Sequence, residues 1–148
     1  MERALQFLRQ HKEVTLATCE GNLPKLRMFQ IMKQEGNLLF FATSEKKAVW
    51  HELLNSPNVE ILAYADNVSV RCSGMVNFNV EDDAKRWIYE NNDVLSRLYN
   101  SYDQLAYFCL PIAEMDYYDL SPTPPIFKHF DLMTGDVGDG FVGDRFKK

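Results

Sequence analysis

The sequence predicts a mainly β protein: a six-stranded antiparallel split β-barrel with helices at its periphery. Three observations support this prediction. Apolar, β-branched and aromatic residues gather in short runs that suit strands. Most of these runs are joined by short turns rich in Gly, Asn and Asp, which favour antiparallel hairpins. Strands do not alternate regularly with helices, so a parallel sheet is not expected, and closing the antiparallel sheet into a barrel would remove its exposed edges.

The first part of the chain is predicted to contain one helix and three strands. Ala4, Phe7, Leu8 and His11 fall on one helical face, which predicts a helix over residues 2–11. Three runs rich in β-forming residues follow, separated by turns that contain Gly21 and Gly36. The strands are expected over residues 14–19, 26–32 and 38–43.

A helix is predicted over residues 45–54, between the third and fourth strands. Ser44 is a suitable N-cap residue, and Pro57 follows soon after the helix and stops it. The residues that recur at helical spacing are Val49, Trp50, Leu53 and Leu54.

The next part of the chain is predicted to contain a hairpin, a second helix and the last barrel strand. Asp66 and Asn67 form the turn of the hairpin, and Asp82 opens the helix. Side chains alternate between two faces near Tyr117, as in a strand with two different faces. The three strands are expected over residues 59–65, 68–76 and 113–120.

Residues 121–148 differ in composition and are predicted to form a C-terminal arm outside a barrel domain of residues 1–120. Three prolines near the start of the arm make it stiff and non-helical, and four of the seven glycines follow. Several phenylalanines could attach the arm to the barrel or to a partner subunit. These arm residues are Pro122, Pro124, Pro125, Phe127, Phe130, Gly135, Gly138, Gly140, Phe141, Gly143 and Phe146.

Length, composition and charge exclude several classes of protein. A chain of 148 residues with 46% hydrophobic content suits a single domain with its own core. The net charge of −5 argues against nucleic-acid binding, because an acidic domain repels phosphate backbones. Three widely spaced cysteines predict neither a disulfide framework nor a metal site. No apolar run is long enough to span a membrane, so the sequence predicts a reduced, cytoplasmic protein.

A candidate anion site lies where the third strand is followed by the predicted helix. Thr43 and Ser44 supply hydroxyl groups there, and Lys46 and Lys47 lie in the first turn of that helix. Cations are unfavourable at a helix N-terminus, so their presence is explained if an anion such as phosphate binds at this place. Two solvated surface lysines explain the same residues equally well, and both interpretations stay open.

Arg27 is the one charged residue within a strand of otherwise long and mostly apolar side chains. Its guanidinium could bind a phosphate through two hydrogen bonds, or it could lie on the solvent face of the sheet. Gln30, in the same strand, could hydrogen-bond to the polar edge of a ring. These residues alone do not decide between the alternatives.

The order of these features resembles the pyridoxamine 5′-phosphate oxidase-like, FMN-binding split barrels. The resemblance consists of a glycine- and proline-containing turn before Arg27, a strand that ends in Thr43, a basic pair before a helix, and an Asn-x-Pro-x-Val segment that opens the next strand. It covers about residues 5–120, and its specific part is confined to residues 21–61.

The resemblance implies that the protein is a homodimer with FMN at the subunit interface. It also implies that the protein is a flavin-dependent oxidoreductase that acts on a small molecule. The implied phosphate ligands are Arg27, Thr43, Lys46 and Lys47, with Ser44 as a further candidate. The implied neighbours of the flavin ring are Met28, Phe29 and Gln30. Met32 stands where the oxidases have a lysine, which argues against oxidation of vitamin B6. Some relatives bind haem or a deazaflavin, so a non-catalytic flavin or haem carrier is the alternative.

Overall fold

The computed structural model describes residues 1–139, and residues 140–148, with the arm residues Gly140, Phe141, Gly143 and Phe146, lie outside the described part. The helices are α1 (Glu2–Gln10), α2 (Ala48–Asn55), α3 (Asp82–Asn91), α4 (Asp93–Leu98) and the short 3-10 helix η1 (Tyr102–Gln104). The strands are β1 (Glu13–Glu20), β2 (Leu23–Gln30), β3 (Lys33–Glu35), β4 (Leu38–Thr43), β5 (Asn58–Ala65), β6 (Val68–Met75), β7 (Ala106–Pro111), β8 (Glu114–Asp119), β9 (Ile126–Asp131) and β10 (Val137–Asp139).

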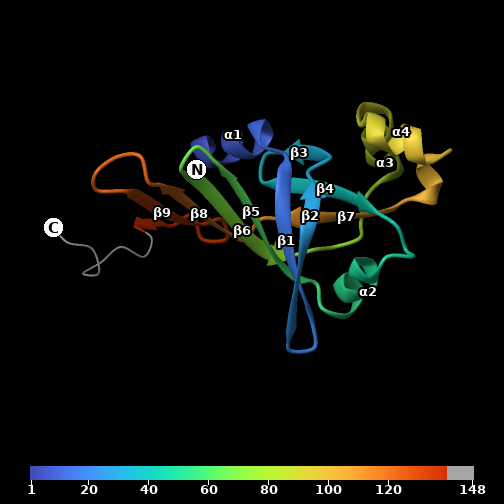
Figure 1. Ribbon diagram of the computed structural model, residues 1–148, viewed down its shortest axis with the longest axis horizontal. Helices are drawn as coiled ribbons and strands as arrows, with labels where there is room; N and C mark the ends of the chain where they lie inside the picture. The colour runs from blue at the N-terminus through green and yellow to red at the C-terminus, as the bar shows by residue number, and fades with distance from the viewer. Residues whose placement is uncertain (140–148) are drawn as a thin grey trace.

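The strands form two antiparallel sheets, with the helices around them (Figure 1). The larger sheet has the strand order β10-β9-β8-β6-β5-β1-β2, and the smaller has the order β3-β4-β7. Backbone hydrogen bonds join the two sheets at two places, one just after β6 and one just after β2. Asn77, just after β6, and Cys109 of β7 exchange two hydrogen bonds of 2.9 Å, and Met32, just after β2, donates one of 2.9 Å to Phe40 of β4. The mainly β class with peripheral helices, predicted from the sequence, is confirmed.

An aromatic cluster fills the space between the two sheets. Phe41 of β4 and Phe108 of β7 stack with their ring centroids 5.1 Å apart. Phe29 of β2 meets both rings edge-on, at 6.0 and 5.7 Å. Burying three aromatic rings in this way provides much of the driving force for packing the sheets together.

All six predicted barrel strands are present, as β1, β2, β4, β5, β6 and β8. The structure adds β7, a continuous apolar run without alternation, because both of its faces are covered. One face of β4 and β7 lies on the aromatic cluster, and the other packs against α3 and α4 through Phe40, Ala42, Ile88, Leu95, Tyr107 and Cys109. The first part of the arm adds β9 and β10 to the edge of the larger sheet.

Helix α2 begins at Ala48, so the prediction that it starts at Glu45 with Ser44 as its N-cap was wrong. The Ser44 carbonyl accepts a hydrogen bond from the Lys47 amide at 3.0 Å, and its Oγ accepts one from the Lys46 amide at 3.2 Å. These bonds close a turn before the helix. Lys46 therefore lies in that turn and Lys47 is the N-cap residue, so the two lysines precede the helix.

Candidate functional site

The turn between β4 and α2 brings four of the predicted phosphate ligands together. Thr43 is the last residue of β4 and is buried, Ser44 is half-buried, and Lys46 and Lys47 are exposed. The lysine side chains are therefore free to meet a ligand from solvent, while the threonine hydroxyl faces the interior of the protein.

The Thr43 hydroxyl has no hydrogen-bond partner among the described residues, although the residue is only 5% exposed. Leaving a buried hydroxyl unpaired costs about 1–3 kcal/mol, so such groups nearly always have a partner in native proteins. A phosphate oxygen is a suitable partner, because a hydroxyl can donate to it. This unpaired group, close in sequence to two exposed lysines, is the observation that best fits a bound phosphate, which would contact the hydroxyl once the atoms that cover it move.

Arg27 lies on the inner face of β2, where it joins β1 and α2 in one hydrogen-bonded network. Its Nη2 donates to Glu52 Oε1 of α2 at 2.6 Å. Its Nη1 donates to Thr18 Oγ1 at 2.7 Å and to the Leu16 carbonyl at 3.2 Å. The Thr18 hydroxyl in turn donates to Glu52 Oε1 at 2.6 Å. Figure 1 shows α2 beside the β1–β2 hairpin, the two parts of the fold that this network joins.

The network leaves one edge of the Arg27 guanidinium available. A guanidinium has five N–H donors, and three of them are used by Leu16, Thr18 and Glu52. Since Thr18 and Glu52 also bond to each other, they occupy the edge between Nη1 and Nη2. The other edge, formed by Nε and the second N–H of Nη2, makes no hydrogen bond within the described part of the chain, and two such donors suit a phosphate.

Glu52 is a member of this network that the sequence analysis missed. It is 6% exposed, yet it stays ionised. The hydrogen bond from Thr18 lowers the pKa of Glu52, and the Arg27 guanidinium lowers it further, against burial, which would raise it. The available signal was its position on the buried face of α2 with Val49 and Leu53, where an acid requires a partner.

The predicted neighbours of the ring lie on two faces of β2. Phe29 points inward and belongs to the aromatic cluster, whereas Met28 points outward and is exposed. Within the described part of the chain, β2 is an edge strand of the larger sheet. Half of its peptide groups therefore face away from β1, and these include groups between Met28 and Gln30 that a ligand could reach.

The outer face of the larger sheet carries a group of exposed apolar side chains over β1, β2 and β5. The strand register places Leu26 beside Ala17, and places Thr15 between Met28 and Leu62. The large members of this apolar face, Leu26, Met28, Leu62 and Tyr64, are between 42% and 68% exposed. Exposed apolar side chains gathered on one sheet face, here with Thr15 and Glu60 among them, are typical of a protein interface.

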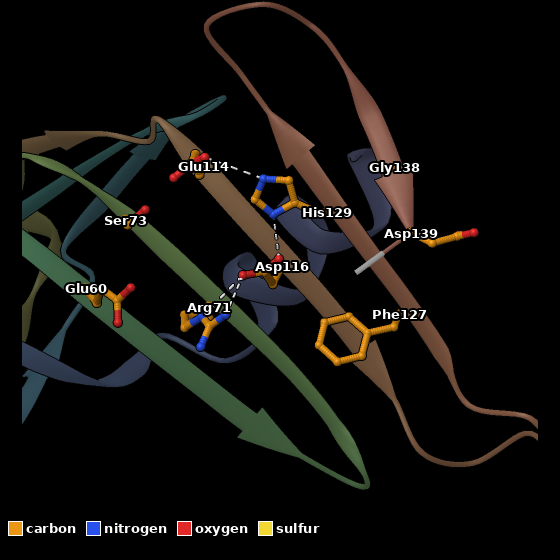
Figure 2. Close-up of a pocket in the computed structure, with 9 residues that line it drawn as sticks. All are labelled: Glu60, Arg71, Ser73, Glu114, Asp116, Phe127, His129, Gly138 and Asp139. Atoms are coloured by element: carbon orange, nitrogen blue, oxygen red, sulfur yellow. Dashed lines mark hydrogen bonds and ion pairs between the residues drawn. The ribbon is translucent and has the colours of Figure 1, made fainter. Parts of the chain in front are cut away.

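The same face carries charged residues over β6, β8 and β9, around a cavity of about 500 Å³ (Figure 2). The His129 ring lies between two carboxylates, with Nδ1 2.7 Å from Asp116 Oδ1 and Nε2 3.5 Å from Glu114 Oε1. Arg71 donates to the other oxygen of Asp116, at 2.8 and 3.2 Å. These residues fasten β9 to β8 and β6. None of the predicted phosphate ligands lines this cavity.

The His129 cluster predicts a pH-dependent contribution to stability. The hydrogen bond with Asp116 and the charges of Asp116 and Glu114 raise the pKa of His129 above its ordinary value of 6.5, against burial, which lowers it. A raised pKa means that the stabilisation is fully present below pH 6.5 and is lost as the pH rises through the higher folded-state pKa.

Replacing His129 with glutamine should remove this pH dependence. We expect the variant to be less stable than wild type at about pH 6 and close to wild type at about pH 9, when urea unfolding is followed at both values. The difference is small because His129 is partly exposed. An equal loss of stability at both pH values would show that the protonated form makes no special contribution.

None of the helices in the described part of the chain is long and apolar enough to cross a membrane.

Comparisons with known proteins agree with this fold. A family model described as pyridoxamine 5′-phosphate oxidase matches residues 1–110, and the curated protein sequences give no match. A pyridoxamine 5′-phosphate oxidase-related, FMN-binding protein from Nostoc punctiforme PCC 73102 superposes with a TM-score of 0.75 and 16% identity, over 96% of this chain and 94% of that one.

Two further solved structures have the same fold. A nimC/nimA family protein from Clostridium acetobutylicum has a TM-score of 0.73 and 23% identity, over 88% of this chain and 93% of that one. A heme binding protein from Mycobacterium smegmatis has a TM-score of 0.68 and 13% identity, over 86% of this chain and 56% of that one. Proteins that bind different cofactors therefore share this architecture.

Proposed function

The chain belongs to the pyridoxamine 5′-phosphate oxidase family, and from this we propose that it binds FMN and acts as a flavin-dependent oxidoreductase on a small molecule. The unpaired, buried hydroxyl of Thr43 beside Lys46 and Lys47 carries the proposal. FMN has a phosphate that suits these groups. FMN-binding is also the property named for the similar protein of Nostoc punctiforme.

The proposed phosphate ligands are the Thr43 hydroxyl, the two lysines and the free edge of Arg27, with Ser44 as a further donor. Arg27 is linked by its ion pair with Glu52 to α2, the helix that the lysines precede. Together they offer to a dianion two lysines that are unpaired within residues 1–139, an arginine that is shared with Glu52 and a buried hydroxyl, an arrangement that favours a phosphate monoester.

The proposed ring site lies along the free edge of β2. Peptide groups between Met28 and Gln30 that face away from β1 are suited to the polar edge of a flavin. Bound there, the flavin would supply two-electron redox chemistry, while the protein binds it, orients it and shields one side from water.

We also propose that two copies of the chain associate through the apolar face on β1, β2 and β5. This face includes Leu26 and Met28 of the strand that forms the proposed ring site. Burying it in a homodimer would remove exposed apolar area from water, and it would place the flavin near the boundary between subunits.

The phosphate assignment is tested by FMN titration of the Lys46→Ala/Lys47→Ala variant. Losing charged hydrogen bonds to a phosphate costs about 1.5–3 kcal/mol, so the dissociation constant should rise about ten- to a hundredfold. Quenching of flavin fluorescence measures it directly. Both lysines are exposed, so the fold should be unaffected.

Arg3→Ala/Arg97→Ala is a matched control, since it removes two exposed cations that lie away from β2 and from the turn before α2. It should bind FMN as wild type does. If both double variants lose affinity equally, the effect comes from overall charge and the assignment to the turn before α2 is wrong.

The alternative function is a non-catalytic carrier of flavin or haem on the same fold. A relative of this architecture is named a heme binding protein. The two functions are separated by adding NAD(P)H to the FMN-loaded protein and following flavin absorbance without oxygen. Reduction followed by reoxidation with an acceptor would support an oxidoreductase, whereas a bound flavin that stays oxidised would support a carrier.

A further inference from the structure

Glu52 is a buried anion placed next to a proposed anion-binding site. It lies on the inward face of α2, 6% exposed, with its Oε1 held by Thr18 and Arg27 at 2.6 Å each. A buried carboxylate of this kind opposes the binding of a second anion nearby, because charges interact strongly where water is excluded.

Glu52 neutralises the cation that would otherwise attract a phosphate most strongly. Arg27 is partly buried and is paired with Glu52 directly, while Lys25, on the same inner face, adds a weaker attraction to Glu52. A phosphate on the free edge of Arg27 would have to share this guanidinium with the carboxylate. Most of the net positive charge offered to the ligand therefore comes from the exposed lysines, which solvent and salt screen.

We propose that Glu52 lowers the affinity of the site for the flavin phosphate and so keeps FMN exchangeable. This rests on the proposed function, since it assumes that the phosphate binds Arg27 and the basic turn. Glu52 has two effects: its hydrogen bonds position the guanidinium with one edge free, and its charge weakens the attraction of that edge for a dianion.

The Glu52→Gln variant removes the negative charge of residue 52 while keeping the hydrogen bonds that position the Arg27 guanidinium. Glutamine has nearly the same shape, and its Oε1 can accept the same hydrogen bonds from Thr18 and Arg27. We expect FMN to bind about tenfold more tightly, mainly through slower dissociation, with a steeper dependence on salt. Riboflavin, which lacks the phosphate, should bind as it does to wild type. Fluorescence titration and stopped-flow displacement of FMN measure these effects.

Glu90→Gln is the control, because it removes one exposed carboxylate from α3, away from α2. It should leave FMN affinity unchanged. Unchanged or weaker binding of FMN by Glu52→Gln would overturn the proposal. If Glu52→Gln does not fold, as judged by circular dichroism, Glu52→Met is of similar length, carries no charge and should also bind more tightly.

The outcome also distinguishes this inference from the function on which it rests. If Lys46→Ala/Lys47→Ala loses FMN affinity while Glu52→Gln is unchanged, only the role of Glu52 is wrong. If the lysine variant keeps wild-type affinity, the phosphate site itself is wrong, and with it the proposed role of Glu52.

Discussion

Replacing Arg27 with methionine is expected to lower the free energy of unfolding by about 3 kcal/mol at neutral pH. The change removes the cation that pairs with Glu52 at 2.6 Å and leaves a carboxylate that is 6% exposed without a countercharge. Methionine keeps much of the apolar stem of the side chain, so the loss of the ion pair dominates. Urea unfolding followed by circular dichroism measures the effect.

The penalty of the Arg27→Met variant should depend on pH. In wild type the pKa of Glu52 is below its ordinary value of 4.5, so its stabilising contribution is present above pH 4.5 and is lost as the pH falls through the lower folded-state pKa. In the variant, burial without a cation raises the pKa of Glu52 instead. The variant should therefore lose stability as the pH rises above 4.5, and approach wild type in acid.

Arg71→Met is the matched control. Arg71 also lies on a strand of the larger sheet and pairs with Asp116 at 2.8 Å, but its side chain is 53% exposed. An exposed ion pair contributes less than about 1 kcal/mol. If the Arg27 and Arg71 variants are equally stable, the buried charge of Glu52 does not need Arg27 as its partner, and the ion pair is not the source of the expected loss.

The structural role of Arg27 also determines how its role in binding should be tested. The Arg27→Met variant leaves the buried charge of Glu52 without a partner, and this charge would weaken FMN binding even if Arg27 never touched the phosphate. The exposed lysines, Lys46 and Lys47, test the phosphate site without this complication.

Replacing Leu26 with glutamate is expected to separate the proposed dimer into monomers. Leu26 lies on the apolar face and is 68% exposed in the single chain. Both copies would carry the change, and burying each carboxylate costs about 2 kcal/mol or more, so the dissociation constant should rise by at least about a thousandfold. Analytical ultracentrifugation measures it, and FMN affinity should fall with dimerisation if the flavin lies near the subunit boundary.

Leu98→Glu provides a close control, because Leu98 of α4 is also 68% exposed but lies outside the apolar face. It should leave the oligomeric state unchanged. A wild-type protein that is monomeric at micromolar concentration, or a Leu26 variant that stays dimeric, would contradict the assignment of the interface to this face.

Much of the fold could be predicted from the sequence because most barrel strands have one buried face and one exposed face. In β5, for example, buried and exposed residues alternate from Val59 to Tyr64, and this period of two identifies a strand. Strand β7 was not predicted because it is buried on both faces, between the aromatic cluster and α3. A continuous apolar run shows no alternation of apolar and polar residues, so its sequence does not identify it as a strand.

The candidate site was predictable only in part. The basic turn and Thr43 are contiguous in sequence, so their chemistry could be recognised there. The predicted start of α2 was too early. Serine is common both as a helix N-cap and as the first residue of a turn, and only the hydrogen bonds from the Lys46 and Lys47 amides show that Ser44 begins a turn here. The partnership of Arg27 with Glu52 joins residues 25 positions apart, and only the packing of α2 against the β1–β2 hairpin brings them together.

The most direct test of the central claim compares FMN with riboflavin as ligands of the wild-type protein. The two molecules share the flavin ring and differ in the phosphate, so the difference in affinity reports the phosphate contacts alone. With Arg27, Thr43, Lys46 and Lys47 as ligands, FMN should bind at least about a hundredfold more tightly than riboflavin. The difference should shrink strongly in Lys46→Ala/Lys47→Ala. Equal affinities for FMN and riboflavin, or a preference that the lysine variant keeps, would contradict a phosphate site between β4 and α2.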